Sequence, residues 1–306
     1  MKRLLVFVFA VALLGSCDTG VVNNVENKAE NKVNTKVGYT LIPDENFEQA
    51  LIDLGYDKGN TDGSVQSVII NSIEKLNIRS KEIGDLTGIE AFTALSELLC
   101  DDNRLTKLDV SKNTLLTNLE CGYNRLTKLV LSKNTHLTNL NCDKNILTKL
   151  DVSKNIALSE LWCDNNRLTK LDVSKNTALE ALLCTDNQIT SLDVSKNTAL
   201  SSLACGENQI ISLDVSKNIY LQVLSCYRNK LSSLELTNNT ALTTLVCYEN
   251  QISNLNLINN TALTDLGCSW NELTSLDLIN NTALTYLNCN NNNFDCEALK
   301  AKYNLK

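Results

Sequence analysis

The chain repeats one phrase every 21 residues from Leu95 onward. Nine complete copies begin at residues 95, 116, 137, 158, 179, 200, 221, 242 and 263, and a partial copy begins at residue 284. Their shared pattern is LxxLxCxxNxLxxLDVSKNTA. A fixed period of about 20 to 50 residues indicates a solenoid, in which each repeat forms one coil that stacks on the next. The period therefore predicts stacked coils that complete one another's hydrophobic core.

The columns of the repeat divide into constant and variable positions. Counted from the first leucine, columns 1, 4, 6, 11, 14 and 16 are apolar, and columns 9 and 19 are Asn in every complete copy. Columns 4 and 6 are two residues apart, so they point to the same face of a strand. We expect a strand over columns 3–6 and a second extended piece over columns 13–16. The asparagines are expected to satisfy turn backbone groups that a strand ladder leaves unpaired.

No helix is expected on the far side of each coil, because its second half is rich in Asp, Val, Ser, Asn and Thr, which are poor helix formers. The pattern resembles bacterial leucine-rich repeats of the 21-residue IRREKO type, in which LxxLxCxxN is followed by LxxLDL, and the resemblance covers residues 95–294. It implies a mainly β solenoid: a right-handed leucine-rich-repeat superhelix with short helical N- and C-terminal caps.

Ten cysteines occupy column 6, one in each copy. Stacking would place them in a row, which does not suit tetrahedral zinc, and parallel side chains do not suit the torsion of a disulfide. Small buried apolar residues suit the column best, so we predict buried thiols. Cys296 lies outside the column, and the sequence leaves open whether it pairs with Cys289.

The first residues form a targeting pattern. MKR is followed by the apolar run LLVFVFAVALL and then by Gly15, Ser16 and Cys17, which predicts a signal peptide over 1–16. LLGSC resembles the lipobox of bacterial lipoproteins. This resemblance implies acylation of Cys17 and anchoring in the cell envelope, in the outer membrane, with surface exposure left open. An ordinary secretory signal with an unrelated cysteine is the alternative. Residues 17–38 are polar and repetitive, and we expect a disordered tether.

Two caps are expected to close the solenoid. Residues 39–72 are predicted to form an N-terminal helical cap, in which Pro43 and Asp44 begin a helix. The segment resembles the N-terminal cap of surface leucine-rich-repeat proteins of Gram-negative bacteria. The repeats span 73–294, with one 22-residue coil before the 21-residue coils from 95, and 295–306 form a C-terminal cap. The loop after the first helix lacks two calcium ligands, since Lys58 and Ile69 stand in their places, so we predict a metal-free turn.

Composition excludes several classes of function. The net charge of −7 and the pI near 4.9 argue against nucleic acid, because nothing neutralises phosphates. His136 is the only histidine, and the repeat pattern does not place a serine or cysteine nucleophile next to it. We therefore predict a non-catalytic protein with no catalytic residues, cofactor or metal.

The variable columns 2, 3, 5, 7, 8 and 10 remain for function. Columns 3 and 5 flank the buried leucine and should face outward, and columns 7 and 8 should lie at the strand ends. The candidate partner-binding residues are the aromatics of these columns: Trp162, Tyr227, Tyr248, Trp270 and Tyr286. Acidic residues occupy the N-terminal part of the same face: Asp101, Asp102, Asp143, Asp164 and Asp186.

We expect this face to recognise a protein or peptide partner. A glycan-binding or adhesion module that uses the same aromatics is the alternative, because stacking aromatics with interspersed Asp and Asn also suit sugars. The alternative to a binding role is that these columns vary without selection on a face that tolerates any residue. The third hypothesis for function is hydrolysis that depends on His136. The sequence does not identify the partner, the membrane side or the oligomeric state.

Overall fold

The computed structural model describes residues 37–305, which belong to one compact unit. The predicted signal peptide 1–16, the lipidation residue Cys17 and the tether up to residue 36 lie outside the described residues.

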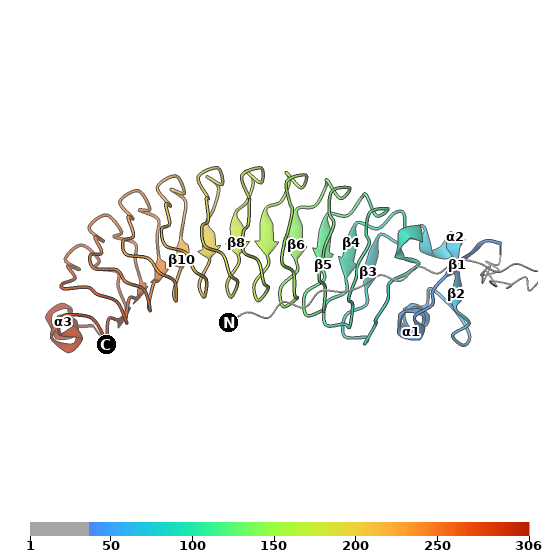
Figure 1. Ribbon diagram of the computed structural model, residues 1–306, viewed down its shortest axis with the longest axis horizontal. Coiled ribbons are helices and arrows are strands. Elements are labelled where there is room, and N and C mark those ends of the chain that lie inside the picture. The colour runs from blue at the N-terminus through green and yellow to red at the C-terminus, as the bar shows by residue number, and fades with distance from the viewer. Residues whose placement is uncertain (1–36, 306) are drawn as a thin grey trace, which may run out of the picture. The chain divides into compact units, whose positions relative to one another are not determined.

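The described residues form a parallel β-solenoid, as the sequence predicts. Eleven short strands, one per coil, pair in sequence order into a single sheet (Figure 1). They are β3 (Lys75–Asn77), β4 (Glu97–Leu99), β5 (Asn118–Glu120), β6 (Asn139–Asn141), β7 (Glu160–Trp162), β8 (Ala181–Leu183), β9 (Ser202–Ala204), β10 (Val223–Ser225), β11 (Thr244–Val246), β12 (Asp265–Gly267) and β13 (Tyr286–Asn288). Each strand covers columns 3–5. The second extended piece, expected at columns 13–16, forms no strand in residues 37–305.

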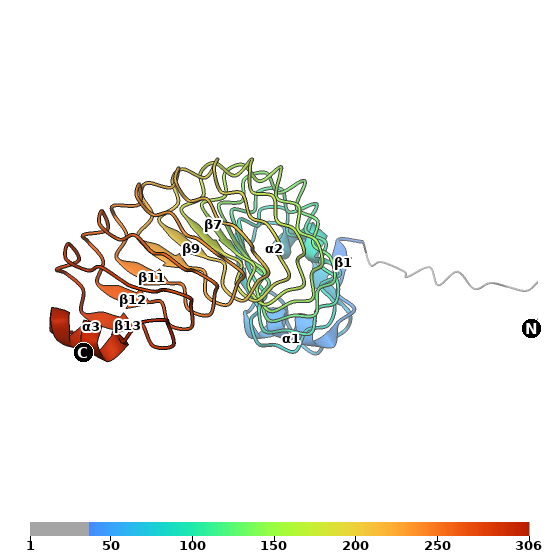
Figure 2. The ribbon, with the colours of Figure 1, turned by 60° about the vertical axis from the view of Figure 1, so that its left-hand side comes forward.

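The strands pair in constant register. Leu161 of β7 lies opposite Leu140 on one side and Leu182 on the other. Each column of the repeat therefore becomes a row across the sheet (Figure 2). Within β6, for example, Leu140 is buried, whereas Asn139 and Asn141 are partly exposed. The alternation follows from the two-residue period of a strand.

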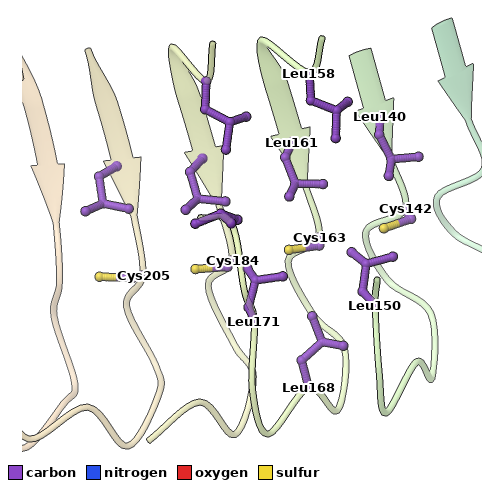
Figure 3. Close-up of a cluster of buried hydrophobic side chains, with 14 of the residues drawn as sticks. Leu140, Cys142, Leu150, Leu158, Leu161, Cys163, Leu168, Leu171, Cys184 and Cys205 are labelled. Carbon is purple, nitrogen blue, oxygen red and sulfur yellow. The ribbon is translucent and has the colours of Figure 1, made fainter. Parts of the chain in front are cut away.

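The invariant apolar columns form one continuous core. Leu161, Cys163 and Leu168 are fully buried, and Figure 3 shows the sulfur atoms of successive coils in one row. The nine column-6 cysteines before Cys289 are buried free thiols, as predicted. Burial raises their pKa, to about 12 for Cys205, so they remain protonated and poorly nucleophilic at neutral pH. In the last coil, Cys289 forms a disulfide with Cys296.

Column 9 joins each coil to its neighbours. Asn187 Oδ1 accepts a hydrogen bond from the backbone N–H of Leu168 at 2.9 Å. Its Nδ2 donates to the carbonyls of Cys163 at 3.0 Å and Cys184 at 3.1 Å. One buried amide thus satisfies three backbone groups in two coils, which a small apolar residue could not do.

Column 19 is bonded less completely. Asn176 Nδ2 donates to the carbonyls of Val152 at 3.0 Å and Asn155 at 2.8 Å. Its Oδ1 is buried and has no hydrogen-bond partner in the described part of the chain. Both asparagine columns therefore join each coil to the coil before it, but only the column-9 amide also uses its oxygen.

The N-terminal end is closed by β1 (Tyr39–Leu41), α1 (Glu45–Asp53), β2 (Ser64–Gln66) and α2 (Ser67–Ile70), and the first coil carries the 3-10 turn η1 (Ile89–Ala91). Asp44 caps α1 by accepting from Phe47 N–H at 3.0 Å, and its other oxygen accepts from Gly84 N–H at 2.8 Å. The buried Glu48 carboxylate accepts from the backbone of Asp62 at 2.8 Å. The Glu48 carboxylate thus binds the backbone of the loop that follows α1.

The C-terminal helix that the fold prediction included is α3 (Cys296–Tyr303). Asp295 caps it by accepting from Ala298 N–H at 3.0 Å. The Tyr303 hydroxyl donates to Asp277 Oδ1 at 2.8 Å, which ties the helix to the last coils. Within residues 37–305, every helix is too short or too polar to span a bilayer.

We predict that Asn187→Ala lowers the free energy of unfolding by about 1–3 kcal/mol, because it leaves buried backbone groups unpaired. Urea denaturation monitored by circular dichroism measures the change. Asn254→Ala is the matched control, since Asn254 is exposed. Equal midpoints for the two variants would contradict a structural role for the column-9 amide.

Candidate functional site

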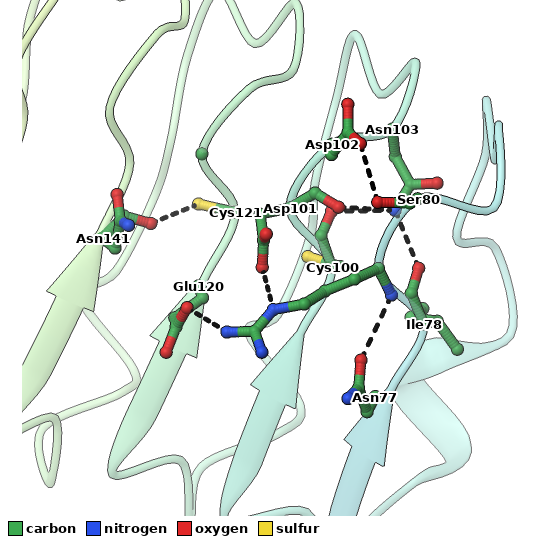
Figure 4. Close-up of polar contacts among 12 residues, drawn as sticks. Asn77, Ile78, Ser80, Cys100, Asp101, Asp102, Asn103, Glu120, Cys121 and Asn141 are labelled. Atoms are coloured by element: carbon green, nitrogen blue, oxygen red, sulfur yellow. Dashed lines mark hydrogen bonds and ion pairs between the residues drawn. The ribbon is translucent and has the colours of Figure 1, made fainter.

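Columns 3, 5, 7 and 8 of successive coils form one surface, which we call the sheet face. Columns 3 and 5 are the outward residues of the strands, and columns 7 and 8 belong to the turn that follows. Arg79 shows that these columns share a surface, because it forms ion pairs with both Asp101 of column 7 and Glu120 of column 5 (Figure 4). The column-8 residue of each coil has a positive φ, as at Trp270 with 55°. The same turn therefore recurs along the face.

The N-terminal part of the sheet face is acidic. Burial, followed by the charge of Asp164, raises the pKa of Asp143 above its ordinary value. The pKa of Asp164 is also raised, chiefly by burial, although its Oδ1 accepts from Thr185 N–H at 2.7 Å. Asp143 Oδ1 is buried without a hydrogen-bond partner in residues 37–305. These carboxylates therefore carry negative charge that the chain itself leaves poorly compensated.

A hollow of about 90 Å³ lies beside Trp162. Trp162 is 40% exposed. The hollow is lined by residues of β5, β6 and β7: Asn118, Glu120, Asn139, Leu140, Asn141, Glu160 and Trp162. It combines one aromatic ring with carboxylates and primary amides, which are groups that bind polar or cationic ligands.

The column-5 side chains of the sheet face become shorter beyond Trp162. Column 5 continues through Leu183, Ala204, Ser225 and Val246 to Gly267, as the register of the strands requires. Short side chains leave this part of the sheet accessible along its length.

Two of the predicted aromatics form a stacked pair. The rings of Tyr227 and Tyr248 lie with centroids 4.7 Å apart and planes 19° apart. Tyr227 also covers Gly206, since a Cβ at Gly206 would lie 2.6 Å from Tyr227 Cε1. Trp270 and Tyr286 are 60% and 53% exposed, respectively. The structure thus brings Tyr227 and Tyr248, which lie on neighbouring coils, into ring contact. The other three candidates, Trp162, Trp270 and Tyr286, lie on three other coils.

Sequence reasoning missed part of this surface. Glu160 and the amides around Trp162 were not singled out, although they occupy columns 3 and 5 of neighbouring coils. Tyr123, in column 8, is a further aromatic of this surface, and Lys144 Nζ lies 4.1 Å from its ring centroid. His136 is exposed in column 21, outside the sheet face, with Nδ1 3.2 Å from the Thr114 carbonyl oxygen.

Comparison with known proteins places the fold among leucine-rich-repeat structures. No family model matches the chain. Internalin J of Listeria monocytogenes serotype 4b (strain F2365) is 41% identical over 88 residues, which make up 27% of this chain and 9% of internalin J. The solved functional domain of internalin J, which includes a cysteine ladder, is 36% identical with a TM-score of 0.70 and covers 82% of this chain.

This chain covers 61% of the solved internalin J domain and 9% of the whole internalin J sequence, which is less than two thirds in both cases. A second Listeria internalin, inlF, is 25% identical with a TM-score of 0.70, over 82% of this chain and 83% of its own. A leucine-rich-repeat protein of Leptospira interrogans is 27% identical with a TM-score of 0.62, over 67% of this chain and 57% of its own. The chain is therefore similar in sequence and fold to bacterial internalins, which are leucine-rich-repeat proteins.

We predict that Asp143→Asn stabilises the fold at pH 7. A carboxyl group whose pKa is higher in the folded than in the unfolded chain opposes folding once it ionises. The stabilisation should shrink as the pH falls through the raised pKa toward the ordinary value of 3.8. Thermal unfolding of both proteins between pH 3 and pH 8 measures it.

Asp151→Asn is a control of opposite sign. The Asp151 carboxylate accepts from Ser153 N–H at 2.9 Å, and this hydrogen bond lowers its pKa. Its removal should not stabilise the fold at pH 7. The same pH profile for both variants would contradict the electrostatic account of Asp143.

Proposed function

We propose that the sheet face recognises a protein or peptide partner, and that the chain does so without catalysis as a lipid-anchored protein of the cell envelope. The observation that supports this function most is the separation of constant from variable positions. The core columns repeat the same residues, whereas the outward columns present exposed aromatics such as Trp162 and Trp270. Exposed Trp and Tyr contribute much of the binding energy in many protein interfaces.

The dimensions of the face also favour a macromolecular partner. Eleven parallel strands about 4.8 Å apart make a sheet roughly 50 Å long. A stable interface uses about 20–30 residues on each side, which this length can supply. The small side chains from Leu183 to Gly267 would let the partner approach the sheet closely between Trp162 and the Tyr227–Tyr248 pair.

A distant structural neighbour supports the same use of the fold. The leucine-rich-repeat ectodomain of an Arabidopsis thaliana receptor kinase, 20% identical with a TM-score of 0.61, was solved in complex with CASPARIAN STRIP INTEGRITY FACTOR 2. At that identity the likeness concerns the fold alone, so the partner of this chain is inferred from its own surface.

Partner binding is tested with a photoreactive amino acid placed at Ser202 on the sheet face or at the exposed Lys196 of column 18. On intact cells, we expect specific cross-links from position 202 and none from position 196. Excess unlabelled protein should compete with the labelled protein and reduce these cross-links. Purified partner is then titrated against variants. Trp162→Ala and Trp270→Ala should each weaken binding about tenfold or more, as truncation of interface aromatics does.

The stacked pair is tested by a glycine substitution that changes no aromatic residue. Gly206→Ala should displace the Tyr227 ring, because the new Cβ would lie 2.6 Å from Tyr227 Cε1, and should weaken binding. Asn254→Ala, at an exposed position outside the sheet face, should leave binding unchanged. Equal cross-linking from positions 202 and 196 would contradict the proposal. Binding of polysaccharides but not proteins, lost in both Trp variants, would favour the glycan alternative.

The anchor is proposed from the sequence pattern at Cys17 alone. Cys17→Ala should abolish incorporation of labelled fatty acid and release the protein from the membrane fraction. At about 0.8 kcal/mol per buried CH₂, loss of the acyl chains removes the main membrane affinity. Fractionation of cells that express each form measures this. Equal membrane association and label in both forms would contradict lipidation at Cys17.

A further inference from the structure

The hollow beside Trp162 specifies the chemistry of the partner more closely, and this inference rests on the proposed function of the sheet face. We propose that the hollow receives the basic end of a lysine or arginine side chain from the protein partner. Its lining, the charge around it and the carboxylate of Glu160, which forms no ion pair within residues 37–305, all point to a cation.

The lining of the hollow suits a guanidinium or ammonium group. The exposed indole of Trp162 offers the best aromatic face for a cation–π contact. Glu120 and Glu160 lie on the same hollow with the primary amides of neighbouring strands. An arginine presents five N–H donors in one plane, which carboxylate and amide oxygens can accept while the ring stacks on the indole.

The charge of the surrounding sheet face is complementary to such a group. Over the coils of β3 to β8, columns 3, 5, 7 and 8 carry eight carboxylates and three cations. The carboxylates are Glu97, Asp101, Asp102, Glu120, Asp143, Glu160, Asp164 and Asp186, and the cations are Lys75, Arg79 and Lys144. Negative charge in excess raises the local concentration of cations and speeds their association.

The three cations of this surface already have partners. Lys75 pairs with Glu97, Arg79 pairs with Asp101 and Glu120, and Lys144 lies on the Tyr123 ring. Among the described residues, Glu160 forms no ion pair. Glu160, which lines the hollow together with Trp162, thus has no cation partner in residues 37–305, and a partner's basic residue would supply one.

Asp143 and Asp164 support this assignment. They occupy column 7 of two neighbouring coils, in the turns that follow β6 and β7. Neither of them forms an ion pair in residues 37–305. Their poorly compensated charge adds to the attraction at the hollow. The aromatic end of the face is different, because Arg228 there lies between Glu207 and Glu249 and forms an ion pair with each of them.

The hollow is tested with two peptides that differ only in charge. A hexa-arginine peptide and its neutral hexa-citrulline counterpart are titrated against the Trp270→Phe protein, in which Trp162 is the sole tryptophan. Trp162 fluorescence reports occupancy of the hollow directly. We expect the arginine peptide to change the emission and to bind at least about tenfold more tightly than the citrulline peptide, with the difference reduced by salt.

Glu160→Gln in the same background should weaken arginine-peptide binding about fivefold, in line with the loss of an ion pair at an exposed position. Glu272→Gln is the matched control, because it removes the same charge from an exposed position outside the hollow. Circular dichroism confirms that each variant is folded. Equal binding of the two peptides, or equal effects of the two Glu→Gln changes, would overturn the inference.

The outcomes separate this inference from the proposed function. If the cross-linked partner depends on Trp162 but replacement of its Lys and Arg residues by Gln does not weaken binding, the basic ligand is wrong and the recognition face stands. If the arginine peptide binds as expected but no partner cross-links from position 202, the hollow stands and the recognition face is wrong. Emission changes caused by oligosaccharides but not by the arginine peptide would assign the hollow to sugars and overturn the inference.

Discussion

The structure depends on hydrogen bonds that join each coil to its neighbours through buried asparagine amides. Asn187 connects the backbone of its own coil to that of the coil before it. Because every coil from Leu95 onward offers the same carbonyl and N–H groups at the same places, each of these coils needs the same residue in column 9. The constancy of the core columns therefore follows from stacking, and one coil cannot change its interior without disturbing two neighbours.

The same constraint leaves the outward columns free. The core columns fix the backbone of each strand, and the side chains of columns 3 and 5 do not. Column 3 can therefore be Glu160 in one coil and Val223 in another. A rigid sheet then presents an acidic part with a hollow at Trp162 and an aromatic part at Tyr227 and Tyr248. Such preorganised surfaces lose little entropy on binding, which suits recognition.

The sequence predicts the fold well because the period, the apolar columns and the asparagines all describe repeated local contacts. It predicts the outward position of Trp162 for the same reason. The hollow was not predicted, because it depends on how side chains of three coils lie against one another. The ion pairs of Arg79 come from the atypical first coil, where the pattern is weakest. The Cys289–Cys296 disulfide could not be decided, since Cys296 lies outside the repeat.

Thiol labelling tests the stacked interior most directly. Native protein is treated with iodoacetamide, and each cysteine is quantified by peptide mass spectrometry with and without denaturant. The account predicts that Cys163, Cys184 and Cys205, which are fully buried with raised pKa, remain unlabelled until the protein unfolds and then react together. Labelling of these three in native buffer at the rate of a free thiol would contradict it.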